Sequence, residues 1–250
     1  MRNNRIRKYY LVPFGLALRV FEERSFREFQ VWLLLKHWTN GHVQLTPAIV
    51  ARLAAHLNTS SRTVERAVSR LRQKNWLGYN SNNDLTHVRG FDTLRIVEKL
   101  PGRLAVWFDI DRMSDVEAFT TACAFGSFVR AQKVRYWRER LGGKEKGVPI
   151  QPKRPANLPK FFPVALSLIE RQYGVPRSTV CRYRKAATRA GFMLTKKKKP
   201  EHLNIDNIRA YLKGFPEMQG RIFKRGGEWF LRQTDEVQTN LTYKRRPHLE

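Results

Sequence analysis

Cysteine and long hydrophobic runs are scarce in this chain of 250 residues. The two cysteines, Cys123 and Cys181, are too few for a disulfide framework or a zinc site, so each is expected to be buried or half-buried. The longest aliphatic run, Val31–Leu35, is far too short to span a bilayer. No long apolar stretch with a cleavage site follows the basic N-terminus. These absences predict a cytoplasmic chain without membrane contact.

The signatures of several enzyme classes are also missing. The six histidines form no His-x-His pair, which argues against metal-dependent relaxases and rolling-circle initiators. The phosphate-cradling pattern Gly-x-x-x-x-Gly-Lys-Ser/Thr is absent. Asp109 and Asp111 stand two apart at the end of an expected strand, but no third acidic partner is evident, so we interpret them as strand-end and turn residues. The sequence therefore predicts a non-enzymatic protein with no metal and no cofactor.

Acidic residues are few beside the basic ones. Lys and Arg number 48 and Asp and Glu 21, which gives a formal net charge of +27. Both halves contribute, because residues 1–140 hold 24 basic and 12 acidic residues and residues 141–250 hold 24 and 9. Such self-repulsion is rare in a globular protein without a polyanionic partner. The charge indicates a nucleic-acid partner, the alternative being a highly soluble cationic protein.

Caps and apolar periodicity predict a mainly helical α+β chain with small antiparallel β wings. The stretch up to about Val20 is expected to be an arm or strand, residues 76–107 a loop-rich antiparallel segment, and Gly226-Gly227 the turn of a hairpin. The Gly- and Pro-rich stretch 141–160 is interpreted as a linker between domains 1–140 and 161–250. Helices are expected over about 25–37 and 114–140, each opened by a capping box (Ser25–Glu28 and Ser114–Glu117), and over 46–57, 61–74, 163–172, 177–190 and 206–213.

Residues 53–71 meet the local demands of a helix-turn-helix, two short helices packed at a steep angle. Ala54 is small enough for the helix crossing, and Asn58 tolerates the left-handed backbone of the turn. Ser60 or Ser61 is expected to cap the second helix, whose buried stripe is Val64, Val68 and Leu71. The opposite stripe is able to bond phosphates or base edges: Arg62, Thr63, Arg66, Ser69, Arg70 and Gln73.

Residues 169–185 form a second copy. Gly174 supplies the turn, and Val180, Tyr183 and Ala187 form the expected buried stripe. In both copies a Thr-Val pair is followed, eleven residues after the valine, by a turn-like residue and then an aromatic: Asn75-Trp76 and Gly191-Phe192. Two residues depart from the pattern, because Glu170 stands where a small crossing residue is expected and Arg184 where an apolar one is.

At these two segments and their following hairpins the chain resembles the winged helix-turn-helix superfamily. The resemblance implies two winged-helix domains in which the second helix of each unit enters the major groove and the wing tracks phosphates. Joined in one basic chain, two such units also loosely resemble initiators of plasmid or phage replication. The residues expected to contact DNA are Ser61, Arg62, Thr63, Arg66, Arg70, Arg177, Ser178, Thr179, Arg182, Lys185, Lys196, Lys197, Lys224 and Arg225.

The expected function is sequence-specific binding of double-stranded DNA in the cytoplasm, as part of the nucleoid, by a replication initiator or transcriptional regulator of a mobile element. One alternative is that one half is an interaction module, with a homodimer formed through an aromatic face of the N-terminal domain: Phe26, Phe29, Trp32 and Trp38. Another is non-specific architectural binding to DNA. RNA binding is less favoured, because no stacking-sheet or RNA signature is recognised.

Overall fold

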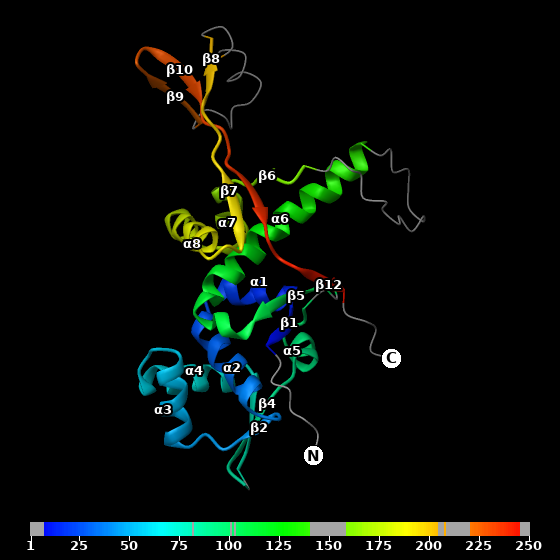
Figure 1. Cartoon of the computed structure of the whole chain (residues 1–250), viewed down its shortest axis with the longest axis vertical. Coiled ribbons are helices and arrows are strands. Elements are labelled where there is room, and N and C mark those ends of the chain that lie inside the picture. The colour runs from blue at the N-terminus through cyan, green and yellow to red at the C-terminus, as the bar shows by residue number, and fades with distance from the viewer. Residues whose placement is uncertain are drawn as a thin grey trace.

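The computed structural model describes residues 8–81, 83–100, 102, 104–140, 159–204, 208 and 221–245. Within these ranges the chain is an α+β structure, mainly helical, with eight α-helices and four three-stranded antiparallel sheets (Figure 1). This agrees with the α+β class expected from the sequence.

The first part of the chain opens with strand β1 (Tyr9–Pro13) and helix α1 (Phe14–Glu23). The expected arm is therefore only partly a strand, since the buried positions Leu16, Ala17, Val20 and Phe21 recur with helical period and fold back onto the core. The elements that follow are α2 (Phe26–Trp38), β2 (His42–Val43), α3 (Pro47–His56), α4 (Ser61–Gln73), β3 (Leu77–Asn80), β4 (Leu85–Val88), α5 (Phe91–Val97), β5 (Leu104–Asp109) and the 3-10 helix η1 (Ile110–Asp115).

Helix α6 (Val116–Arg140) then leads into the second part. Its first turns are buried because they pack between α1 and α8. After the stretch 141–158, which lies outside the described residues, come β6 (Phe162–Pro163), α7 (Leu166–Tyr173), α8 (Arg177–Arg189), β7 (Met193–Lys196), β8 (Glu201–Leu203), β9 (Ile222–Arg225), β10 (Glu228–Leu231), β11 (Glu236–Thr239) and β12 (Tyr243–Arg245). The helix expected over 206–213 lies outside the described residues except for Ile208.

Two groups of elements share one topology. The first unit (residues 26–88) contains α2, β2, α3, α4, β3 and β4, with sheet order β2-β4-β3. The second unit contains α6, β6, α7, α8, β7 and β11, with sheet order β6-β11-β7. In each sheet the last strand of the unit, β4 or β11, is central. The strand before the helix pair, β2 or β6, lies on one side of it, and the strand after the pair, β3 or β7, lies on the other.

A third sheet, β8-β10-β9, is inserted between β7 and β11 of the second unit, and we call it the inserted sheet. The Gly226-Gly227 turn joins β9 to β10 as expected, and both glycines have positive φ. The hairpin pairs with β8 and not with β7, because β7 pairs with the later strand β11. Figure 1 shows this sheet at one end of the molecule, beyond the second unit.

The fourth sheet, β1-β5-β12, brings the last described strand back to the first part of the chain. One hydrophobic cluster runs through both parts, from Val12 to Val237. The division into domains 1–140 and 161–250 remains a prediction, and the stretch 141–158 of the expected linker lies outside the described residues. The described contacts cross this division, because α6 packs on α1, on α8 and on β11.

Three local predictions were wrong. Ser25 is the N-cap of α2, but its hydroxyl donates to Glu23 at 3.4 Å and no capping box forms. Ser114 lies within η1, and α6 begins only at Val116. Residues 76–107 contain strands as expected but also helix α5, whose N-cap Gly90 offers no side-chain cap to mark it in the sequence.

Candidate nucleic-acid interface

The turn between α3 and α4 has the geometry that the sequence predicts. Asn58 has a positive φ of 47°, and the N–H of Thr59 closes the end of α3 on the carbonyl of Ala54 at 2.9 Å. Ala54 is buried at the crossing. Ser60, rather than Ser61, caps α4, since its Oγ accepts from the backbone N–H of Thr63 at 3.3 Å.

Helix α4 buries one stripe and exposes the other. Val64, Ala67, Val68 and Leu71 face the core. The expected outer stripe is exposed at Arg62, Arg66, Ser69, Arg70 and Gln73, and Ser61 in the first turn is exposed as well. The face thus presents three guanidinium groups together with hydroxyl and amide groups, which are groups able to bond phosphates and base edges.

Two expected contact residues of α4 are held by the protein itself. Arg70 donates from Nη1 to Oε1 of Glu28 at 2.7 Å, and the Glu28 side chain is only 7% exposed. The Thr63 hydroxyl lies 2.9 Å from that of Ser60 at the helix cap. We therefore place Arg70 and Thr63 among the residues that position α4, and Ser61, Arg62 and Arg66 on its open surface.

The turn between α7 and α8 also follows the prediction, and it explains both departures. Gly174 has a positive φ of 63°. Glu170 accepts a hydrogen bond from the N–H of Arg177 at 3.1 Å, so a carboxylate satisfies the first turn of α8 where Pro176 has no capping side chain. Arg184 forms a 2.9 Å ion pair with Asp235, which ties α8 to the residue preceding β11.

The outer face of α8 is more basic than that of α4. Arg177, Ser178, Arg182 and Lys185 are exposed, and Thr179 is half-buried. Arg189, which the sequence analysis did not select, is exposed one further turn along the same stripe. The sequence could have indicated Arg189 by its spacing, because it follows Arg182 by the same seven residues that separate Gln73 from Arg66.

The two helices repeat in register. Each spans thirteen residues, each is followed by a residue with positive φ (Asn75 at 56°, Gly191 at 76°) and each is then followed by a buried aromatic, Trp76 or Phe192. In the view of Figure 1, α4 and α8 both lie to the left of the long axis, whereas α5 lies to the right. The two helices thus lie on the same side of the long axis in this view.

A basic pocket of about 380 Å³ lies beside the N-terminal end of α8. Asp235 is the one acidic residue of its lining, and Arg177 contributes from the expected contact set. Arg221 donates to the Arg232 carbonyl at 2.9 Å and to the Thr234 hydroxyl at 2.8 Å, which fixes its guanidinium there. The basic residues of the lining are Arg177, Arg184, Lys198, Arg221 and Arg232. Sequence reasoning missed most of them because they come from four separate segments.

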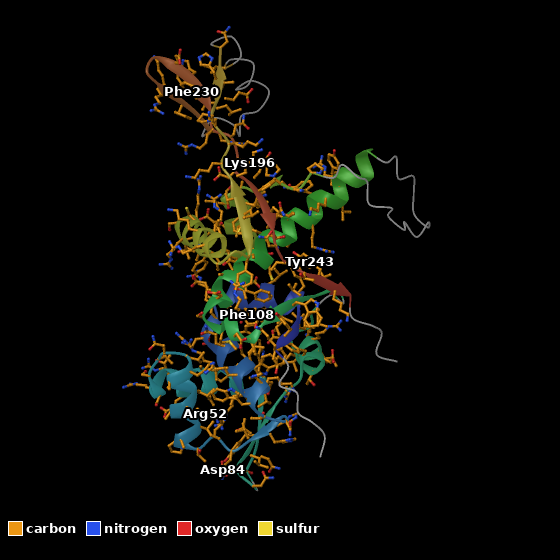
Figure 2. The ribbon with its side chains drawn as sticks, viewed as in Figure 1. Arg52, Asp84, Phe108, Lys196, Phe230 and Tyr243 are labelled. Carbon is orange, nitrogen blue, oxygen red and sulfur yellow. The ribbon has the colours of Figure 1, made fainter. Side chains whose placement is uncertain are left out.

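The lysines expected to grip phosphates are exposed. Lys196 ends β7, Lys197 follows it, and Lys224 and Arg225 end β9 (Lys196 is labelled in Figure 2). Lys224 also lies over the ring of Trp229, at 5.8 Å from its centroid. The β3–β4 hairpin of the first unit carries Asp84 near its tip instead, so its described part is less basic.

Of the four aromatic residues expected to form a dimer face, two are buried in the core and two are half-buried. Phe29 and Trp32 are fully buried. Phe26 packs edge-on against Tyr183 of α8, and Trp38 packs against His56 and under Arg52. Of the four, Phe26 makes a ring contact with the second unit, and the ring contacts of the other three lie within the first part of the chain. A homodimer through the N-terminal domain stays a prediction.

The other residues considered for chemistry have structural contacts. The Asp109 carboxylate accepts from the N–H of Asp111 at 3.0 Å, and both residues pair with Lys8. Asp109 ends β5 as expected, and Asp111 lies in the first turn of the 3-10 helix η1. Cys123 is buried, which raises the pKa of its thiol, and Cys181 is half-buried. Burial raises the pKa of Glu117, and nearby Arg182 opposes that shift. Within the described residues no group of three potential metal ligands occurs.

No family model, curated protein or solved structure matches the chain. None of the helices in the described ranges is long and apolar enough to cross a membrane.

Proposed function

We propose that the chain binds double-stranded DNA sequence-specifically, with α4 and α8 as the recognition helices of two winged-helix units. The observation that carries the proposal is the repeat of one exposed, basic and polar helix face in the same register on both units. An ordinary surface helix needs neither the left-handed turn before it nor the positive φ and buried aromatic after it, and both helices have all three. In the winged-helix arrangement this face enters the major groove.

The chemistry of the two faces suits base edges and phosphates. Arg62 and Arg66 on α4, and Arg182 on α8, offer the guanidinium fork that pairs with guanine in the major groove. Lys196, Lys197 and the basic pocket lie beside α8, where phosphates of the same duplex would pass. Phosphate contacts supply affinity and register, and the helix faces supply the sequence reading.

The positions of α4 and α8, both left of the long axis in Figure 1, are compatible with simultaneous binding. Two recognition helices on one face of a duplex contact sites about one helical turn apart, roughly 10–10.5 bp, or a multiple of that. We therefore expect a bipartite or repeated site. Such a site suits a replication initiator or a transcriptional regulator of a mobile element, and its genomic position (origin or promoter) distinguishes the two roles.

Non-specific architectural binding is the competing function, and the net charge of +27 favours it. Selection from a random pool of duplexes with the purified full chain, at two salt concentrations, separates the two. A bipartite motif that survives higher salt supports specific reading by both units. Binding that vanishes with salt and enriches no motif contradicts the proposal.

Matched variants then test the two faces. Arg66→Ala and Arg182→Ala should each weaken binding to the selected duplex about 10- to 100-fold and relax selectivity at one half-site. Lys99→Asn is the control, because Lys99 is an exposed cation following α5, and asparagine tolerates its positive φ of 49°. A loss for Lys99→Asn as large as for the other two would indicate charge attraction alone.

A further inference from the structure

The inserted sheet has two faces of different character. Side chains alternate along each strand, so one face carries Leu203, Ile222 and Leu231. These form a small separate cluster with Ile208 and Trp229. This face is the core of the inserted sheet, and a three-stranded sheet needs only one such face for its stability.

The opposite face carries a row of three aromatic rings. Phe230 on the central strand β10 is directly opposite His202 on β8 and Phe223 on β9. The ring centroids of Phe223 and Phe230 lie 5.7 Å apart with an interplanar angle of 26°, and those of His202 and Phe230 lie 5.5 Å apart at 85°. We call these three residues the aromatic row.

The aromatic row is not part of the described hydrophobic core. Neither Phe223 nor Phe230 belongs to either cluster of buried residues or to the side chains packed against them. His202 is exposed, and the two phenylalanines are half-buried by one another and their neighbours. Figure 2 shows Phe230 at the end of the molecule opposite Arg52 and Asp84, away from α4.

Cations surround the row. The guanidinium of Arg232 lies over the Phe223 ring at 5.6 Å from its centroid, and Arg225 follows Phe223 on the same face of β9. Arg232 also lines the basic pocket, so this one side chain borders both the row and the pocket. The exposed run Lys196–Lys199 leads into the sheet at β8, and Glu228 is the acid on this face, 3.8 Å from His202.

We propose that the aromatic row is a stacking platform for single-stranded DNA. Rings on neighbouring strands of a sheet accept successive unpaired bases, whichever bases these are, and flanking Arg and Lys hold the backbone. Duplex DNA buries its bases in the stack and offers the rings nothing to accept. The choice of DNA rather than RNA rests on the proposed function of α4 and α8. The assignment of a stacking surface rests only on the geometry of the aromatic row.

The site suits an oligonucleotide spanning several bases. Two or three rings accept two or three bases, and OB folds, which also combine stacking rings with a basic groove, have site sizes of about 4–16 nucleotides. A chain with both sites would hold a duplex along α4 and α8 and an opened strand on the inserted sheet at one end. That end is the one adjoining the second unit, because the inserted sheet lies between β7 and β11.

The test is fluorescence anisotropy of a labelled deoxythymidine decamer with the full chain. Phe223→Leu with Phe230→Leu retains apolar bulk on the sheet but removes both rings, and we expect the decamer to bind about 10- to 100-fold more weakly. Tyr9→Leu removes an exposed ring from β1 and should leave decamer binding unchanged. Equal thermal unfolding of the three proteins shows that the sheet remains folded.

Two further arms separate the proposals. Arg66→Ala with Arg182→Ala should weaken duplex binding and leave decamer binding intact, so the failure of one function is visible without the other. A double leucine variant that is folded and binds the decamer like the parent chain overturns the platform. Tighter binding of a ribouridine decamer than of the deoxy decamer overturns the choice of DNA.

Discussion

Arg70 on α4 and Glu28 on α2 form a 2.7 Å ion pair in which the arginine side chain is 67% exposed and the carboxylate only 7%. Arg70 and Glu28 were expected to have separate roles, and the structure pairs them with each other. Arg70 was expected to read DNA, and Glu28 was expected to close a capping box. Their pairing links α2 to α4, the helix that also carries Arg62 and Arg66.

Breaking this pair from the arginine side should cost stability. Arg70→Ala leaves the Glu28 carboxylate buried without its charged donor, so we expect the free energy of unfolding to fall by about 1–3 kcal/mol. Its effect on duplex affinity should be smaller than that of Arg66→Ala. Urea unfolding and duplex anisotropy on the two variants provide the comparison.

A double-mutant cycle supplies the control for this prediction. Glu28→Gln with Arg70→Ala removes the buried charge along with its partner, and should recover part of the lost stability. If Arg70→Ala unfolds like the parent chain but binds duplex as poorly as Arg66→Ala, Arg70 is a contact residue and its pairing with Glu28 is incidental.

The cap provided by Glu170 is a second test of how α8 is positioned. Glu170→Ala removes the acceptor of the Arg177 N–H and the negative charge at the helix N-terminus, and we expect a loss of about 0.5–2 kcal/mol. Glu170→Gln keeps an acceptor without the charge, so its free energy of unfolding should lie between those of the parent chain and Glu170→Ala. Equal stability of all three proteins in urea would show that the contact contributes nothing.

The two left-handed turns predict opposite responses to substitution. A Cβ at Gly174 would meet no atom within 4 Å, so Gly174→Ala isolates the backbone strain of its positive φ and should destabilise by about 1–2 kcal/mol. Asn58→Gly relieves the same strain in the first unit and should be neutral or slightly stabilising. Thermal unfolding measures both, and a destabilised Asn58→Gly variant would mean that the asparagine side chain has a role of its own.

Local sequence signals predicted the helix pairs well. The turn residues Asn58 and Gly174, the Ser60 cap and the buried stripes of α4 and α8 each depend on interactions within a few positions of the chain. The Gly226-Gly227 turn was predicted correctly for the same reason. Such features are specified by backbone preference and helical period, which a single sequence displays.

Distant pairings were not predictable in the same way. The partner of β7 is β11, beyond the whole inserted sheet, and β12 returns to β5 across most of the chain. In the sequence Glu28 indicated a capping box, but in the structure it pairs with Arg70. Glu170 departed from the helix-turn-helix pattern, but in the structure it accepts from the N–H of Arg177. Both partners depend on how the helices pack. The basic pocket and the aromatic row depend on such pairings, so no local motif marked them.

The paired histidines of the first unit predict a loss of stability in mild acid. His42 on β2 lies opposite His87 on β4, with ring centroids 4.8 Å apart. Burial lowers the pKa of His87 from its usual 6.5, and the positive charges of His42, Arg89 and Lys36 lower it further. The unfolded chain therefore takes up this proton first as the pH falls.

The direction of the pH effect on stability follows from that order of protonation. Above pH 6.5 both states have a neutral His87 and stability is full, and it declines as the pH falls from about 6.5 towards the lowered pKa of the folded state. Urea midpoints at pH 7.5 and pH 5 measure the decline, which should be modest because the His87 ring is largely exposed. His87→Gln should reduce the difference between the two midpoints, and His42→Gln should reduce it less, since burial is the larger cause of the shift. An unchanged difference in His87→Gln would assign the acid sensitivity to other groups, and the close approach of the two rings would then have no consequence for stability.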